Sequence, residues 1–171
     1  DVTELAGRVA ELIYVREVEV ERDWPDTLRV WVSSYVPAVN ASSPDGSFAL
    51  LAEDGTVLER LEYQDSRLPL ILVDGFGNPG SQVLRIEPLL NAADAVTDDL
   101  GAWIRVLEPV GDGVRAQLVG GVVVELGLDQ DYREKMRSLA SVLTGVELSC
   151  IKSIDVTIPH NPVVIRSAGA C

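Results

Sequence analysis

Residues 121–166 read GVVVELGLDQDYREKMRSLASVLTGVELSCIKSIDVTIPHNPVVIR, and this stretch decides the fold. It begins with an apolar, β-branched run that is too short for a helix and is followed by Gly127. We therefore expect a strand that ends at Gly127. The apolar residues of this strand are Val122, Val123, Val124 and Leu126.

A helix is predicted after this strand. Its apolar residues recur at i, i+4, i+7, i+8 and i+11, which is the spacing of one buried face of a helix. Asp129 is placed to cap the helix, Asp131 and Glu134 suit its positive first turn, and Gly145 can end it in the left-handed conformation. The residues of the apolar face are Tyr132, Met136, Leu139, Ala140 and Leu143.

Two short strands are predicted after the helix. In Ser153–Ile158 apolar and polar residues alternate, and Val163–Arg166 is a second short run bounded by Pro159 and Pro162. Proline cannot donate a ladder hydrogen bond, so we expect 163–166 to be an edge strand of the sheet. Val163, Val164 and Ile165 are apolar and only Arg166 is charged, which suits a strand that receives a strand from another protein. A last strand covered by the protein itself is the alternative.

Composition narrows the class of protein. The chain has 171 residues, 47% of them hydrophobic, which is enough to fill a core. The net charge of -13 argues against a nucleic-acid surface, because phosphate binding needs clustered Lys and Arg. A single His and two cysteines, Cys150 and Cys171, do not form a zinc motif, although a disulfide between the cysteines is possible. No signal peptide or membrane span is visible, so we expect a soluble chain or one whose anchor lies outside this sequence.

The N-terminal segment predicts a helix and a hairpin. Asp1 and Glu4 have capping-box spacing ahead of a helical stripe. Alternation then predicts two strands, Val15–Glu21 and a second one from Leu28 to Val32, joined by a turn at Trp24-Pro25-Asp26. The stripe consists of Leu5, Val9, Leu12 and Ile13.

The middle of the chain predicts short strands and turns. Asp54-Gly55 is a strong hairpin signal between two apolar runs, and Pro88 limits any helix within Val83–Ala95 to shorter pieces. A meander of three strands then precedes the helix of 132–143. The strands expected in this region are Phe48–Leu51, Thr56–Leu61, Leu68–Val73, Trp103–Leu107, Val114–Val119 and Val122–Leu126.

Several residue patterns suggest chemistry. Gly75, Gly77 and Gly80 match the dinucleotide-binding pattern GxGxxG with Asp98 downstream, but Pro79 removes a donor that a pyrophosphate would need. We therefore expect an ordinary loop at 75–80.

Ser153, Asp155 and His160 are close in sequence and could suggest a catalytic triad. The alternation places Ser153 and Asp155 on the outer face of the strand, however, and no nucleophile elbow is present. We therefore expect their proximity to be due to chance.

The carboxylate pairs and the tryptophans have ordinary explanations. Carboxylates are expected to cap helices or solvate turns, since no EF-hand spacing surrounds them. At least two of the tryptophans are expected to pack within strands. The residues alone thus predict a non-catalytic α+β binding module without metal or other cofactor. The carboxylate pairs are Asp98 with Asp99 and Asp129 with Asp131, and the tryptophans are Trp24, Trp31 and Trp103.

Two blocks of sequence resemble the extracytoplasmic part of the bacterial division protein family FtsQ/DivIB. The first is VREVEVERDWPDTLRVWV, which is similar to the later half of a POTRA domain with its R-x-x-P-x-T-hydrophobic pattern. The second, from VELG through YREKMRSLASVL to IDVTIPHNPVVIR, resembles the family's C-terminal lysine-bearing helix and last two strands. The matching residues are Arg22, Pro25, Thr27 and Leu28 in the first block, and Lys135, Leu139, Ile154, Asp155, Val163, Val164 and Arg166 in the second.

The resemblance implies the organisation of the chain. It implies an α+β fold in which the later half of a POTRA domain, 1–36, precedes a mixed, mainly antiparallel β domain, 37–171, with a C-terminal strand-helix-strand-strand unit. The first POTRA strand and helix and the single membrane span would lie outside this sequence. The motif Glu-Arg-x-Pro of many relatives is replaced by Ser34-Tyr35-Val36-Pro37.

The resemblance also implies a function. It implies a non-catalytic divisome scaffold, anchored once in the cytoplasmic membrane, whose extracytoplasmic part binds FtsB, FtsL and other division proteins. A POTRA-bearing outer-membrane assembly or secretion factor and a small enzyme are the alternatives. The partner-binding residues expected are Ile158, His160, Val163, Val164, Ile165 and Arg166.

Overall fold

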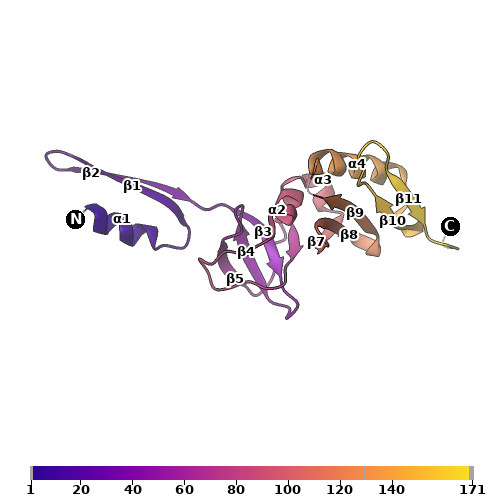
Figure 1. The fold of residues 1–171 in the computed structure, drawn as a ribbon, viewed down its shortest axis with the longest axis horizontal. Coiled ribbons are helices and arrows are strands. Elements are labelled where there is room, and N and C mark those ends of the chain that lie inside the picture. Colours follow the sequence, from indigo (N-terminus) through magenta and orange to yellow (C-terminus); the bar gives the residue numbers. More distant parts are fainter. Residues whose placement is uncertain (1, 129, 170–171) are drawn as a thin grey trace.

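The computed structural model describes residues 2–128 and 130–169, and it has an α+β fold built on two sheets. A two-stranded sheet lies at the N-terminal end, and a nine-stranded sheet of order β11-β10-β9-β8-β7-β6-β3-β4-β5 forms the rest (Figure 1). The larger sheet is mixed and mostly antiparallel. This confirms the fold class predicted from the sequence.

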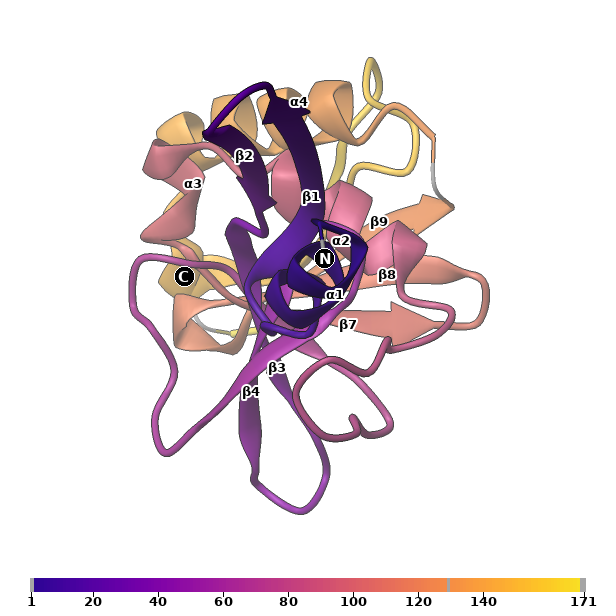
Figure 2. The same cartoon turned by 90° about the vertical axis from the view of Figure 1, so that its left-hand side faces the viewer.

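The N-terminal unit consists of α1 (Val2–Ala10), β1 (Val15–Asp23) and β2 (Thr27–Ser34). The two strands pair antiparallel across the predicted turn at 24–26, and Val18 lies opposite Val32. The helix ends earlier than predicted, because the chain turns after Ala10 and leaves Leu12 59% exposed. Ile13 is likewise outside the helix, and the predicted cap Asp1 lies outside the described residues. In Figure 2 this unit faces the viewer.

Three strands open the larger sheet: β3 (Pro37–Ser42), β4 (Phe48–Ala52) and β5 (Val57–Leu61). The β4–β5 hairpin confirms the turn predicted at Asp54-Gly55. Strand β3 was not predicted, because its fully buried Asn40 interrupts the apolar pattern on which sequence analysis relies. A buried asparagine is tolerated there because its side chain is fully hydrogen-bonded, as described below.

The central part of the sheet is formed by β6 (Leu70–Leu72), β7 (Ile104–Val110) and β8 (Gly113–Leu118). Between β6 and β7 lie α2 (Glu87–Asp94) and the single turn α3 (Asp98–Gly101). Pro88 stands in the first turn of α2, where proline is favoured, so it starts the helix rather than interrupting one.

The C-terminal unit consists of β9 (Val123–Leu128), α4 (Tyr132–Gly145), β10 (Ile151–Asp155) and β11 (Val163–Arg166). The predicted order of strand, helix, strand and strand is confirmed, but three boundaries differ. Strand β9 continues through Gly127, Gly145 is the last helical residue rather than a left-handed cap, and β10 lies at 151–155 rather than 153–158.

The main core lies between this sheet and the helices α2 and α4. The predicted face of α4 is confirmed, because Tyr132, Met136 and Leu139 are buried and Ala140 and Leu143 pack against the core. A smaller apolar cluster on the other face of β4 and β5 contains Leu50, Ala52 and Leu58. The expectation for the tryptophans was wrong, because Trp24, Trp31 and Trp103 are 74%, 47% and 41% exposed.

Two polar contacts connect the N-terminal unit with the larger sheet. The Tyr14 hydroxyl donates to Glu59 Oε2 at 3.1 Å, and Arg16 Nη1 lies 2.5 Å from Glu53 Oε1. Burial, followed by the contact with Glu59, raises the pKa of Tyr14. Among the described residues, no helix is long and apolar enough to cross a membrane.

Candidate partner-binding edge

Strand β11 forms one edge of the nine-stranded sheet, as the flanking prolines predicted. It pairs antiparallel with β10, and β10 in turn pairs parallel with β9. Val163 and Ile165 are each 50% exposed, whereas Val164 packs against the core. Among the described residues, no strand pairs with the outer side of β11. The edge therefore presents apolar side chains next to backbone groups that are open to pairing.

The direction of these backbone groups follows from two hydrogen bonds. The amide of Val156 donates to the Glu125 carbonyl on the β9 side, so the backbone groups of Asp155 and Ser153 point the other way, toward β11. The backbone groups of their partners, Val163 and Ile165, must then point toward β10.

A second hydrogen bond, at the end of β11, indicates the same alternation of backbone directions. The amide of Ser167 donates to the Cys150 carbonyl on the inner side. Since backbone direction alternates along a strand, Val164 and Arg166 direct their N–H and C=O groups outward. The free side of the edge thus offers two donors and two acceptors.

A groove of about 510 Å³ lies beside this edge, between α4 and the loop that joins β10 to β11. Arg137 and Ser141 line its helix side, and Pro159, His160 and Pro162 line its loop side. His160 Nε2 lies 3.6 Å from Glu134 Oε2 across the groove. Arg137 is exposed and has no hydrogen-bond or ion-pair partner among the described residues. The groove lining therefore carries one positive charge, from Arg137, and one negative charge, from Glu134.

The predicted partner-binding residues do not all lie on the edge strand. Val163, Val164, Ile165 and Arg166 form β11, whereas Ile158 and His160 lie in the loop before it. Ile158 is 63% exposed. The loop begins at the end of β10, so both residues remain near the edge without belonging to it.

The POTRA motif residues are far from this edge, at the tip of the β1–β2 hairpin (Figure 1). Arg22 lies opposite Leu28 in the ladder, and its guanidinium stacks 3.9 Å from the centre of the Trp24 ring. Pro25 lies in the turn, and Thr27 begins β2. These residues shape the hairpin tip and do not contribute to the C-terminal edge.

Within the part of the chain that the structure describes, the other residue patterns considered for chemistry do not form a site. Asp155 Oδ1 accepts hydrogen bonds from the amide and hydroxyl of Thr157, while His160 faces Glu134 instead. Residues 75–80 form a loop, and Gly80 has a φ of 89°.

The carboxylate pairs lie near helix starts. Asp98 and Asp99 occupy the first turn of α3, and Asp131 is the N-cap residue of α4 without a side-chain capping bond. Two residues of the sequence predictions lie outside the described residues: Asp129, the predicted cap, and Cys171, for which a disulfide with Cys150 was considered.

Two buried polar residues were not found by their pattern. Lys135 is 4% exposed, and its Nζ donates to the Leu128 carbonyl at 2.8 Å, which fixes α4 to the end of β9. Asn40 accepts from the amide of Asp65 and donates to the carbonyls of Asp65 and Leu68. Both side chains bind backbone atoms of segments that are distant in the sequence, and the local spacing of residues does not predict such a contact.

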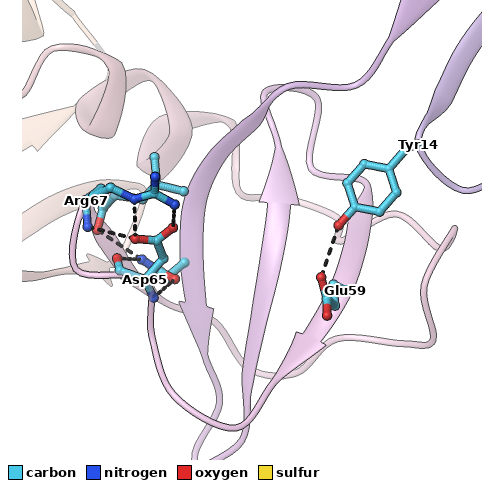
Figure 3. A network of polar contacts seen from close by, with 6 residues as sticks. Tyr14, Glu59, Asp65 and Arg67 are labelled. Carbon is cyan, nitrogen blue, oxygen red and sulfur yellow. Dashed lines mark hydrogen bonds and ion pairs between the residues drawn. The ribbon is translucent and has the colours of Figure 1, made fainter.

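The loop held by Asn40 presents an ion pair (Figure 3). Arg67 donates from Nε and Nη2 to the carboxylate of Asp65 at 3.0 and 2.6 Å. The side-chain hydrogen bonds from Arg67, followed by its backbone amide, lower the pKa of Asp65 to about 2. The loop therefore has a defined charged tip.

Comparison with known proteins agrees with this architecture. Residues 42–157 match the family profile described as cell division protein FtsQ/DivIB, C-terminal, and residues 1–35 match the POTRA domain, FtsQ-type. The fold and the two matches define a POTRA-bearing cell division protein. The chain belongs to the FtsQ/DivIB family.

Curated relatives extend along nearly the whole chain. A cell division protein FtsQ from Mycolicibacterium smegmatis is 30% identical over 167 residues, covering 96% of this chain and 47% of the relative. FtsQ from Mycobacterium tuberculosis is 28% identical over 165 residues, covering 96% and 50%. FtsQ from Streptomyces bingchenggensis is 26% identical over 163 residues, covering 92% and 60%. The chain thus spans about half the length of these relatives.

Proposed function

We propose that this chain is a non-catalytic scaffold of the division machinery that binds an FtsB- or FtsL-type partner by strand addition at β11. The observation that carries the proposal is the open edge, where Val164 and Arg166 direct their backbone groups outward. An added strand satisfies these groups and gains affinity from main-chain hydrogen bonds. Exposed Val163 and Ile165 then provide apolar contacts on one face.

Hydrogen bonding and charge both favour β11 over β5 as the edge that receives a partner strand. Strand β5 ends the other side of the sheet, but residues 80–82 already bond to it, since Gly80 donates to Val57 and Val57 donates to Ser81. Strand β11 has no such cover among the described residues, and Arg166 at its end has no ion-pair partner among them. A partner strand with acidic side chains would find complementary charge here.

The proposal includes the organisation implied by the resemblance. Residues 1–36 form the later half of a POTRA domain, and residues 37–171 form the β domain that carries the edge. A single upstream span anchors the protein in the cytoplasmic membrane with this region on the extracytoplasmic side. The order of the two family matches along the chain supports this division.

The test compares proline at two neighbouring positions of β11. Val164→Pro deletes an outward N–H, so it should weaken binding of the extracytoplasmic segment of FtsB by ~10-fold or more and leave the melting temperature nearly unchanged. Ile165→Pro deletes an N–H that points toward β10 and should lower the melting temperature. Binding is measured by surface plasmon resonance with the purified FtsB segment.

Val164→Ala is the matched control, because it shortens the side chain but keeps the backbone donor. It should bind FtsB within about two-fold of the native chain. Undiminished binding by folded Val164→Pro would show that β11 is not the docking edge.

A further inference from the structure

A second pocket lies beside β6 and β7, two neighbouring strands of unequal length. Strand β6 has three residues and β7 has seven, and Ile71 lies opposite Leu107. The first residues of β7 therefore extend beyond the start of β6, which follows a turn at residues 66–67. The resulting pocket of about 400 Å³ lies between the loop 64–70, the segment 96–102 and the start of β7.

One wall of this pocket is held rigidly. Asn40 is fully buried in β3 and binds the backbone of Asp65 and Leu68, so it clamps both ends of the loop tip. The carboxylate of Asp65 then holds Arg67 through Nε and Nη2. Arg67 Nη1 is not used in this pair, and the residue lines the pocket. The ion pair with Asp65 thus orients the guanidinium of Arg67, whose side chain is 85% exposed.

The facing wall carries a second guanidinium. Arg105, near the start of β7, is exposed, lines the pocket and has no hydrogen-bond or ion-pair partner among the described residues. Thr97 adds a hydroxyl that makes no capping bond, and Leu68 and Ile104 add apolar surface. Two arginines and one acidic residue, Asp98, are the charged residues of the pocket lining, so the lining has a positive formal charge in a chain whose net charge is -13.

We propose that this pocket binds a glutamate or aspartate side chain of an acidic protein segment, at a site separate from β11. Guanidinium groups bind carboxylates through charge-assisted hydrogen bonds, which suits Arg67 Nη1 and Arg105. Asp98 also lines the pocket. Its carboxylate can accept a hydrogen bond from a backbone N–H, which a peptide possesses and an inorganic anion lacks. The site therefore favours a peptide carboxylate.

The test titrates the full chain with the peptide acetyl-Glu-Leu-Glu-Leu-amide. Binding is measured by NMR as changes in the amide chemical shifts of the chain. Saturable shifts at residues 66–70 and 97–105 are expected, and salt should weaken them. Arg105→Gln should weaken binding by about ten-fold, because it removes a charged donor. Arg8→Gln, which removes an exposed arginine on α1 without a partner among the described residues, should have no effect.

Two comparisons decide the chemistry. The peptide with Gln in place of Glu should not saturate, and sodium acetate should bind more weakly than the acidic peptide. Equal binding of the Gln peptide, equal binding by Arg105→Gln, or shifts that map elsewhere would each overturn the proposal. Val164→Pro should leave this binding unchanged, so the result is independent of the function proposed for β11.

Discussion

Leu139 provides a direct test of how α4 is held on the sheet. Its side chain is fully buried in the main core. Replacement by alanine removes three buried carbon atoms, which alone represents about 2.4 kcal/mol of transfer free energy at ~0.8 kcal/mol per methylene. The neighbours belong to a helix and a sheet that cannot collapse fully, so a cavity term adds to this value. We expect Leu139→Ala to lower the free energy of unfolding by ~3 to 5 kcal/mol.

The measurement is urea unfolding followed by far-ultraviolet circular dichroism, with the midpoint and slope fitted separately. Leu128→Ala is the control, because Leu128 is 58% exposed and undergoes the same chemical change. Leu128→Ala should lower the free energy of unfolding by less than about 1 kcal/mol. A loss below ~1 kcal/mol for Leu139→Ala at unchanged slope would refute the packing of α4.

Two further predictions concern local geometry. The pKa of Asp65 is lowered from 3.8 to about 2, mainly by the side chain of Arg67, so its stabilising contribution is present above pH 3.8 and is lost as the pH falls toward 2. Carbon-13 NMR should place its titration midpoint near 2 and return it toward 3.8 in Arg67→Ala, and an unchanged midpoint would exclude this cause. A Cβ at Gly113 would lie 2.6 Å from the Gly127 carbonyl oxygen, so Gly113→Ala should cost ~1 to 3 kcal/mol by urea unfolding. Gly145→Ala meets open space and should be neutral or stabilising, and equal effects of the two changes would contradict the close approach.

The periodicity of apolar residues was sufficient to predict several elements, including β2, although every residue of β2 is exposed. The α4 face, the β1–β2 hairpin and the meander of β7, β8 and β9 all follow from residues that alternate or recur at helical spacing. It did not reveal β3, because the buried Asn40 interrupts the apolar run, and it did not reveal that Lys135 is buried on α4. Their partners are backbone atoms of other segments, which only the tertiary fold brings close.

The candidate site was predictable in position but not in detail. Pro159 and Pro162 indicated an edge, and β11 is an edge. The sequence did not reveal which amides face outward, because this depends on the pairing of β10 with β9 and on the irregularity between Ile151 and Ser153. The arginine pocket was also hidden, since Arg67 and Arg105 are brought together by the unequal lengths of β6 and β7.

Residue-specific amide hydrogen exchange on the full chain, alone and with the extracytoplasmic segment of FtsB, tests the proposed scaffold function most directly. In the free chain the amides of Val164 and Arg166 should exchange rapidly, whereas the amide of Ile165, which faces β10, should be protected. Added FtsB should protect Val164 and Arg166 and change Ile165 little. Rapid exchange at Val164 and Arg166 under saturating FtsB would contradict strand addition at β11.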